Sequence, residues 1–203
     1  MLNMISHGNH LGTPLVIAHG LFGSGRNWGV IARRLSDKRR VITLDMRNHG
    51  SSPWLPDHSY AAMAADISEI ITKIDEPIDL LGHSMGGKAS MLAALTNAPV
   101  RRLIVADIAP VAYAHTQQHL IDAMQALPLT KLSSRLDADT ALKKTDNEPN
   151  IRSFLLQSLN LRECKWRLNL DVLSEFMTQI IGFPKISGQF NRPTLFLAGG
   201  NSD

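Results

Sequence analysis

The sequence has a single cysteine, Cys164, in 203 residues, so no disulfide can form within the chain. Such a sequence suits a reducing compartment. The first ten residues, MLNMISHGNH, lack the basic segment and the apolar stretch of a secretory signal. No apolar run approaches the ~18 residues that span a bilayer. We therefore expect a cytoplasmic protein with no membrane partner.

Aromatic residues are also scarce, with three Trp and two Tyr. The net charge of +3 is small, and basic residues occur as scattered pairs such as Arg33-Arg34 and Arg101-Arg102. Nucleic-acid surfaces usually carry a basic stripe interleaved with stacking rings, so we expect no nucleic-acid partner. With 44% hydrophobic and 19% charged residues, the composition is that of an ordinary globular domain. It leaves the oligomeric state open.

Short apolar runs that end in small or polar residues predict the strands of a sheet. These runs lack polar alternation, which is typical of parallel strands buried on both faces. Amphipathic helical patterns lie between them, at residues 27–36, 60–74 and 85–96. Alternating strands and helices favour a doubly wound α/β fold, which binds ligands at the carboxyl ends of its strands. The predicted strands are residues 15–18, 40–44, 78–81, 103–106 and 194–198.

The pattern changes after residue 112. Residues 113–187 contain helical segments interrupted by Pro128, by polar residues 143–150 and by Gly182-Phe183-Pro184, without an evident strand. We expect a core made of residues 1–112 and 188–203, with 113–187 inserted as a helical lid. The apolar residues of the lid are expected to form its own core or an acyl-binding wall; they are Met124, Leu127, Leu155, Leu156, Leu159, Trp166, Leu173, Phe176 and Met177.

One pentapeptide, Gly82-His83-Ser84-Met85-Gly86, has the G-x-S-x-G pattern of a serine nucleophile. It follows a predicted buried strand and opens a predicted helix, which is the setting of a nucleophile elbow. Side chains at positions 82 and 86 would collide with neighbouring backbone in that strained turn. The pattern therefore predicts Ser84 as a nucleophile and the Met85 N–H as an oxyanion donor.

A second donor is expected from the loop that ends the first strong strand. There the sequence reads His19-Gly20-Leu21-Phe22. In this architecture a backbone N–H of that loop completes the oxyanion hole, and Leu21 is the candidate. A plain glycine-rich turn is the alternative.

Five segments in combination resemble the YbfF-type bacterial esterases of the α/β-hydrolase superfamily. They are HGLFGSGRNW, DMRNHGSS, GHSMGGKA, DIAPVAY and PTLFLAGGNS. The resemblance implies an α/β-hydrolase fold and hydrolysis of small-molecule carboxylic esters, with acyl-CoA thioesters as further candidate substrates. It also implies that no metal or organic cofactor takes part.

Two aspartates compete for the acid of the catalytic triad. The resemblance assigns it to Asp107 in DIAPV, after the strand at 103–106. Asp203 follows the strand at 194–198, the more common acid position across the superfamily. We favour Asp107 and keep Asp203 as the alternative.

The triad order in this fold is serine, acid, histidine, but no histidine follows His119. We expect a chain truncated before its last strand, histidine loop and final helix, and a poor catalyst. His19, His49 and His83 are expected to be structural rather than substitute bases. His115 and His119 share a helix face without a third metal ligand.

Two other classes of protein are weighed against an esterase. One is a non-catalytic α/β-hydrolase scaffold that binds a small ligand. The other is a nucleotide-binding P-loop, because Gly82-x4-Gly87-Lys88 matches part of that motif. Position 89 is Ala, however, and lacks the hydroxyl that binds Mg²⁺, so we expect Lys88 to be an exposed helix residue.

Overall fold

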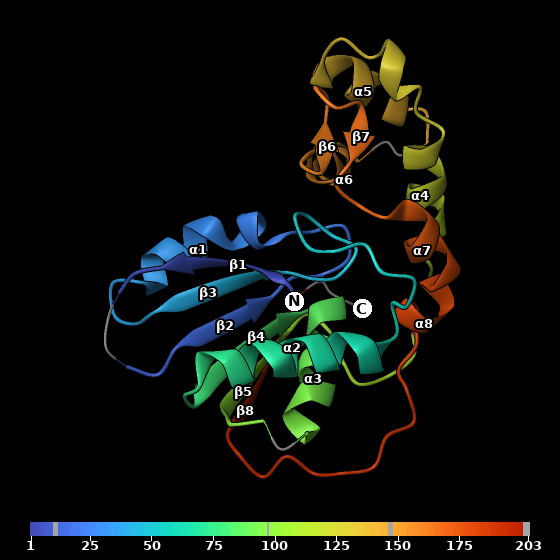
Figure 1. Ribbon diagram of the computed structural model, residues 1–203. Helices are drawn as coiled ribbons and strands as arrows, with labels where there is room; N and C mark the ends of the chain where they lie inside the picture. Colours follow the sequence, from blue (N-terminus) through green and yellow to red (C-terminus); the bar gives the residue numbers. More distant parts are fainter. Residues whose placement is uncertain (10–11, 97, 146–147, 201–203) are drawn as a thin grey trace.

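The computed structural model describes residues 1–9, 12–96, 98–145 and 148–200. Its central sheet has six strands in the order β1-β3-β2-β4-β5-β8 (Figure 1). β1 runs antiparallel to β3, and the other neighbouring strands are parallel. The strands are β1 (Asn3–His7), β2 (Leu15–Ala18), β3 (Val41–Asp45), β4 (Ile78–His83), β5 (Val100–Ala106) and β8 (Thr194–Leu197). The chain thus has the α/β-hydrolase architecture expected from its sequence.

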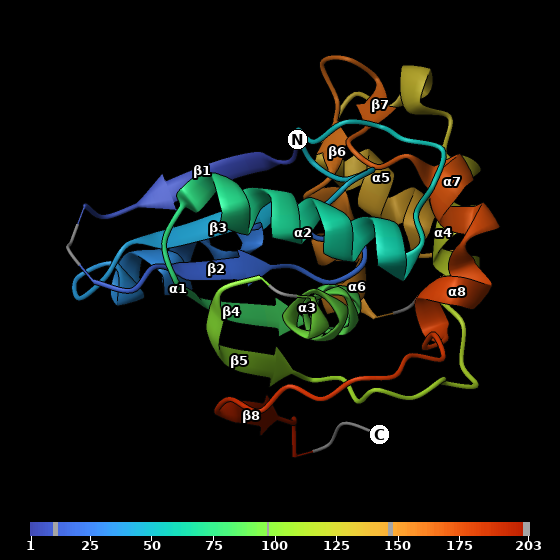
Figure 2. The same ribbon diagram turned by 60° about the horizontal axis from the view of Figure 1, so that its bottom comes forward.

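Helices cover both faces of this sheet (Figures 1 and 2). Along β2, Leu15 and Ile17 face a small apolar cluster that includes Ala32, whereas Val16 and Ala18 face the main core. This alternation follows from the two-residue repeat of a strand. The helices of these faces are α1 (Gly29–Leu35), preceded by the 3-10 turn η1 (Gly25–Trp28), and α2 (Tyr60–Ile74) and α3 (Met85–Leu95) on the opposite side.

Helix α2 shows how local sequence produces one of these elements. The Ser59 hydroxyl accepts a hydrogen bond from Ala62 N–H at 3.2 Å and caps the helix. Met63, Ile67 and Ile70 recur at helical spacing and are fully buried. The helix ends at Asp75, whose φ of 58° is left-handed. The predicted bounds 60–74 are confirmed.

Between β5 and β8 the chain forms a mainly helical insertion, which we call the α4–α8 insertion. It contains a two-stranded hairpin, so the expectation of no strand before residue 194 is wrong. The hairpin strands have two residues each, too few for a periodic pattern in the sequence. The elements are α4 (Gln118–Gln125), η2 (Leu129–Lys131), α5 (Arg135–Leu142), α6 (Pro149–Leu156), β6 (Leu159–Asn160), β7 (Lys165–Trp166), α7 (Leu170–Glu175) and α8 (Met177–Ile181). None of the helices in the described ranges has the length and hydropathy to cross a membrane.

The start of the chain forms β1, in which His7 pairs with Val41. Two sequence expectations fail at the margins of the sheet. Strand β8 is exposed along its whole length, because it lies at the sheet edge and pairs only with β5 among the described strands. In α1, Ile31 and Leu35 remain 44% and 38% exposed, and only Ala32 is buried.

Three buried histidines lie together where β2 and β3 end. The ring centroids of His19 and His49 are 5.1 Å apart, and those of His49 and His58 are 5.6 Å apart. His19 Nε2 accepts a hydrogen bond from Met46 N–H at 2.9 Å, so its proton resides on Nδ1, which lies 2.7 Å from the Gly20 carbonyl. His49 Nε2 accepts from Phe22 N–H at 3.3 Å. These bonds require neutral rings.

Burial favours the same neutral forms. It lowers the pKa of His19 to about 4. The pKa of His58 also falls to about 4, mainly by burial and further through the charge of Arg47. Burial lowers the pKa of His49 well below its usual value, and the two neighbouring histidines add to the effect.

These shifts predict that the protein loses stability in mild acid. As the pH falls from about 6.5 toward 4, the unfolded chain binds protons at these histidines that the folded chain does not. The free energy of unfolding is therefore expected to decrease, by up to about 1.4 kcal/mol per pH unit for each histidine. Urea unfolding at a series of pH values measures this slope. The exposed variant His119→Gln should keep it, and a flat profile between about pH 7 and 5 would contradict the assignment.

Candidate active site

Ser84 lies on the sharp turn between β4 and α3, with φ 49° and ψ −121°. This conformation is rare for a residue with a side chain and costs about 1–3 kcal/mol. Glycines make it possible. A Cβ at Gly82 would lie 2.3 Å from the Gly86 carbonyl oxygen, and one at Gly86 would lie 2.4 Å from the His19 carbonyl oxygen. The steric reason for both glycines, inferred from the sequence, therefore holds in the structure.

The loop after β2 lies directly against this turn. A Cβ at Gly20 would come within 3.0 Å of Ser84 Cβ, so only glycine allows the approach. Gly23 N–H donates to the Gly20 carbonyl at 3.1 Å, and Phe22, with φ 63°, donates its N–H to His49. Among the described residues, the Leu21 N–H has no hydrogen-bond acceptor. The loop is thus held on both sides of Leu21, next to the serine.

Asp107 follows the neighbouring strand. His83 and Ala106 are register partners in β4 and β5, so Ser84 and Asp107 leave the sheet side by side. Ser84 N–H donates to the Ala106 carbonyl at 3.0 Å. Asp107 has a left-handed φ of 54°, and its Oδ1 accepts from Gly199 N–H at 3.2 Å. The other candidate acid, Asp203, lies outside the described residues.

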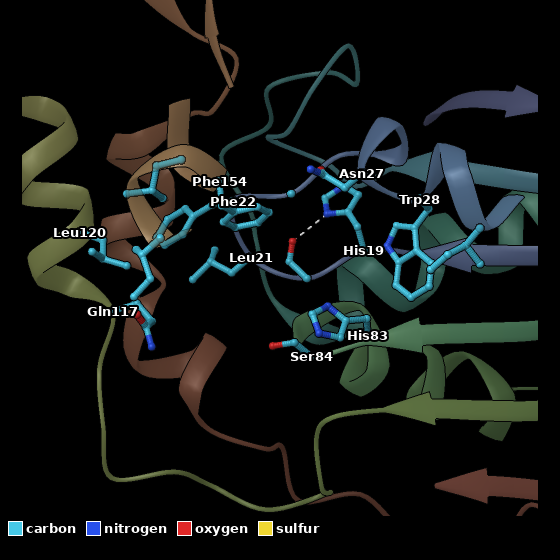
Figure 3. Close-up of a pocket in the computed structure, with 15 residues that line it drawn as sticks. His19, Leu21, Phe22, Asn27, Trp28, His83, Ser84, Gln117, Leu120 and Phe154 are labelled. Atoms are coloured by element: carbon cyan, nitrogen blue, oxygen red, sulfur yellow. Dashed lines mark hydrogen bonds between the residues drawn. The ribbon is translucent and has the colours of Figure 1, made fainter. Parts of the chain in front are cut away.

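The histidines near Ser84 do not provide an evident base. His19 and His83 both line the pocket beside the serine (Figure 3). Burial lowers the pKa of His83, while the nearby Asp107 carboxylate raises it. Within the described ranges no histidine nitrogen hydrogen-bonds to Ser84 Oγ. His115 and His119 are exposed, and these ranges contain no cluster of three or more metal-ligating side chains.

A pocket of about 460 Å³ opens above Ser84, between the core and the insertion. Figure 3 shows the Ser84 hydroxyl pointing into it, with Leu120 and Phe154 across from Leu21 and Trp28. The lining is mostly apolar. It comprises His19, Gly20, Leu21, Phe22, Gly23, Asn27, Trp28, Ile31, His83, Ser84, Gln117, Leu120, Ile151, Phe154 and Leu155.

Of the nine apolar insertion residues expected to form the wall or the lid core, Leu155 alone lines this pocket. The others pack in or against the main hydrophobic core. Sequence reasoning missed Phe154 and Leu120, because which face of a short helix meets the core depends on tertiary packing. Trp28 was also missed, although it lies within HGLFGSGRNW, which carries the resemblance and held a usable signal.

Lys88 is not the exposed residue that the sequence suggested. Its side chain is 1% exposed, and its Nζ donates to the carbonyls of Ile181 and Gly182 at 2.9 and 2.6 Å. A P-loop lysine must reach a bound phosphate, whereas this ammonium is directed into the protein. The geometry therefore gives no support to a nucleotide site.

Comparisons with known proteins agree with this geometry. Residues 13–194 match the family model described as alpha/beta hydrolase fold. The chain is 40% identical over 198 residues to "Esterase YbfF" of Escherichia coli (strain K12), covering 95% of this chain and 76% of that protein. A solved structure titled "Marine microorganism esterase" superimposes with a TM-score of 0.91 at 36% identity, covering 98% of this chain and 80% of that one.

A second group of relatives is longer. The chain is 41% identical over 207 residues to "sn-1-specific diacylglycerol lipase ABHD11" of Xenopus laevis, covering 96% of this chain and 66% of that protein. It thus spans about two thirds of the length of these curated lipases. With the family model, the esterase relative and the strand–turn–helix setting of Ser84 in agreement, the chain belongs to the alpha/beta hydrolase family and is related to the YbfF-type esterases.

Proposed function

We propose that this protein is a serine hydrolase of small carboxylic esters that acts through an acyl-enzyme on Ser84. The observation that carries the proposal is the strained Ser84 turn, whose hydroxyl points into a pocket lined by apolar side chains. The names of the relatives, an esterase and a diacylglycerol lipase, support the same reaction class. Because these names refer to an esterase and a diacylglycerol lipase, the proposal is made for oxygen esters.

In the proposed reaction Ser84 Oγ attacks the ester carbonyl carbon while a general base takes its proton. The carbonyl oxygen becomes an oxyanion, which the backbone N–H groups of Leu21 and Met85 stabilise. The tetrahedral intermediate then expels the alcohol, which receives the proton. Water attacks the acyl-enzyme in the same way, releasing the carboxylic acid and restoring the Ser84 hydroxyl.

Asp107 is the proposed acid of this mechanism. Its carboxylate follows β5, beside the serine strand, and in the proposed mechanism it orients an imidazole and stabilises the imidazolium that forms. The imidazole itself is the component that the described residues do not supply. Without a base, a serine hydroxyl is a weak nucleophile, so we propose that this chain alone turns over esters slowly.

The pocket lining indicates which part of the substrate it holds. Trp28 from the core lies across from Leu120 and Phe154 of the insertion. This apolar lining suits an acyl chain rather than a charged group. In this proposal the Leu21 and Met85 N–H groups next to Ser84 bind the oxygen of the reacting carbonyl. This arrangement favours an ester with an apolar acyl group.

The central test supplies the missing base from solution. Hydrolysis of p-nitrophenyl butyrate is measured with the chain and with Ser84→Ala, over a range of imidazole concentrations. Because the pocket can admit imidazole beside Ser84, we expect imidazole to raise the rate of the unmodified chain at least about tenfold above that of Ser84→Ala.

The Ser84→Ala protein corrects this measurement for the direct reaction of imidazole with the ester. Equal rates for the two proteins at every imidazole concentration would refute Ser84 as the nucleophile. An acyl group on Ser84, detected by mass spectrometry after rapid acid quenching, provides an independent check on the intermediate.

The position of Asp107 predicts a measurable effect on His83. The Asp107 carboxylate raises the pKa of His83, so Asp107→Asn should lower that pKa further. Titration of the His83 ring followed by NMR measures the change. Asp122→Asn, on the exposed side of the insertion, is the control and should leave His83 unchanged. An unaltered His83 titration in Asp107→Asn would mean that the carboxylate does not lie beside the serine strand.

A further inference from the structure

Lys88 is a buried cation on the helix that carries the nucleophile. It lies on the first turn of α3, where its backbone N–H donates to the Ser84 carbonyl at 3.1 Å. Its side chain is 1% exposed. Removing an ammonium group from water is costly unless its hydrogens find acceptors, so the surroundings of Lys88 Nζ need an explanation. Neither the nucleophile nor the oxyanion donors require this residue.

The acceptors come from the insertion. Lys88 Nζ donates to the carbonyls of Ile181 and Gly182, at 2.9 and 2.6 Å. These carbonyls lie at the end of α8, where the last carbonyls of a helix have no partner within it. Tyr60 on α2 donates its hydroxyl to the preceding carbonyl, that of Ile180, at 2.6 Å. Three consecutive carbonyls of the insertion are thus bound by side chains of the core helices.

Two tyrosine rings complete the surroundings of the ammonium. Nζ lies 4.9 Å from the ring centroid of Tyr113 and 5.9 Å from that of Tyr60. Aromatic faces attract a desolvated cation. Burial lowers the pKa of Lys88 to about 8, so the group is still largely protonated near neutral pH. Burial raises the pKa of Tyr60, which keeps its phenol protonated as a donor.

These contacts join both connections between the core and the insertion. Tyr113 lies on the outgoing segment, and its N–H donates to the Ile181 carbonyl at 3.0 Å on the returning segment. Figures 1 and 2 show α8 next to the start of α2, where Tyr60 lies. One ammonium therefore contacts both segments, and it belongs to α3, the helix that starts directly after Ser84.

We propose that Lys88 is a positioning residue that holds the α4–α8 insertion in register with Ser84, through the carbonyls of Ile181 and Gly182. Its effect reaches the pocket through the insertion, because Leu120 and Phe154 form the wall opposite the serine. This consequence for substrate binding rests on the proposed function, whereas the anchoring itself does not. Loss of the ammonium should loosen the insertion at α8 while the core stays folded.

Other contacts allow the variant to fold. Gly50 N–H donates to the Arg167 carbonyl at 2.8 Å, and Asn169 N–H donates to the Asn48 carbonyl at 3.0 Å. These bonds attach the middle of the insertion to the loop after β3. Replacing Lys88 leaves the carbonyls of Ile181 and Gly182 without these donors, but it also removes the cost of keeping an ammonium group out of water. Lys88→Met keeps an unbranched side chain, one atom shorter, and removes the charge and the donors.

The test measures backbone amide hydrogen exchange in the unmodified chain, in Lys88→Met and in Lys38→Met, which changes an exposed lysine. The amides to follow are those of Tyr113 and Gly182, the latter bonded to the Thr178 carbonyl at 3.1 Å. We expect at least about tenfold faster exchange at both in Lys88→Met, with amides inside α2 unchanged. Lys38→Met should exchange as the unmodified chain does.

Unchanged exchange at Tyr113 and Gly182 in Lys88→Met would overturn the proposal. So would an equal acceleration throughout the chain, because that indicates lost global stability rather than a loosened anchor. If Lys88→Met does not fold, Lys88→Arg decides instead, since it keeps the charge and the donors. Protection in that variant within about threefold of the unmodified chain supports the anchor, and a tenfold loss rejects it.

Kinetics separate positioning from a merely structural role. In the imidazole-supported hydrolysis described above, Lys88→Met should raise KM for p-nitrophenyl butyrate at least about fivefold and leave kcat within about twofold. A loss in kcat alone would contradict an effect through the pocket wall. If no Ser84-dependent hydrolysis is seen at all, the proposed function fails, while the exchange experiment still decides whether Lys88 is the anchor.

Discussion

The close contact between the end of β2 and the start of α3 is the constraint on which the rest of the site depends. A side-chain carbon at Gly86 would lie 2.4 Å from the His19 carbonyl oxygen, and one at Gly20 would lie 3.0 Å from Ser84 Cβ. Backbone atoms cannot yield to such overlap without moving both elements. The positive φ of Ser84 is maintained by its surroundings. Strands β2, β4 and β5 are paired next to it, and α3 is buried from its first residue.

The same edge of the sheet also determines where the polar interactions of the core lie. The neutral rings of His19 and His49 accept backbone N–H groups from residues after β3 and from the Leu21–Phe22 loop. They thereby fix the segment that contains the candidate oxyanion donor. Their neutrality is a consequence of burial, so one desolvated environment provides both the loop geometry and its sensitivity to acid. The site is supported by groups that need not touch the substrate.

Much of this arrangement could be predicted from the sequence, because it is encoded over short distances. Each of the five predicted strands is present with ends shifted by at most three residues, and residues 60–74 form the predicted helix. The elbow was identified because glycine spacing, a preceding apolar run and a following helix occur within about twenty residues. The family resemblance depends on similarly local segments.

What the sequence did not reveal depends on contacts between distant residues. Lys88 was expected on the surface, since a lysine in a helix is usually solvated. Its burial follows from carbonyls 93 and 94 positions away. The pocket wall likewise depends on which faces of α4 and α6 turn toward the core, and α8, with five residues, is too short for a clear periodic pattern. Burial of β8 was expected from its apolar sequence, but its exposure is decided by its place at the sheet edge.

The division between local and distant contributions also applies to the proposed chemistry. The nucleophile and oxyanion groups come from residues close to the strand ends, and their geometry is rigid because glycine contacts and strand pairing over-determine it. The pocket wall comes from the insertion, whose placement depends on a few polar contacts with the core. Rigid electrostatic groups lower a barrier without reorganising during the reaction, whereas a wall of apolar side chains can adjust to different acyl groups. Reaction type should therefore be set by the sheet edge, and substrate range by the way in which the insertion is anchored to it.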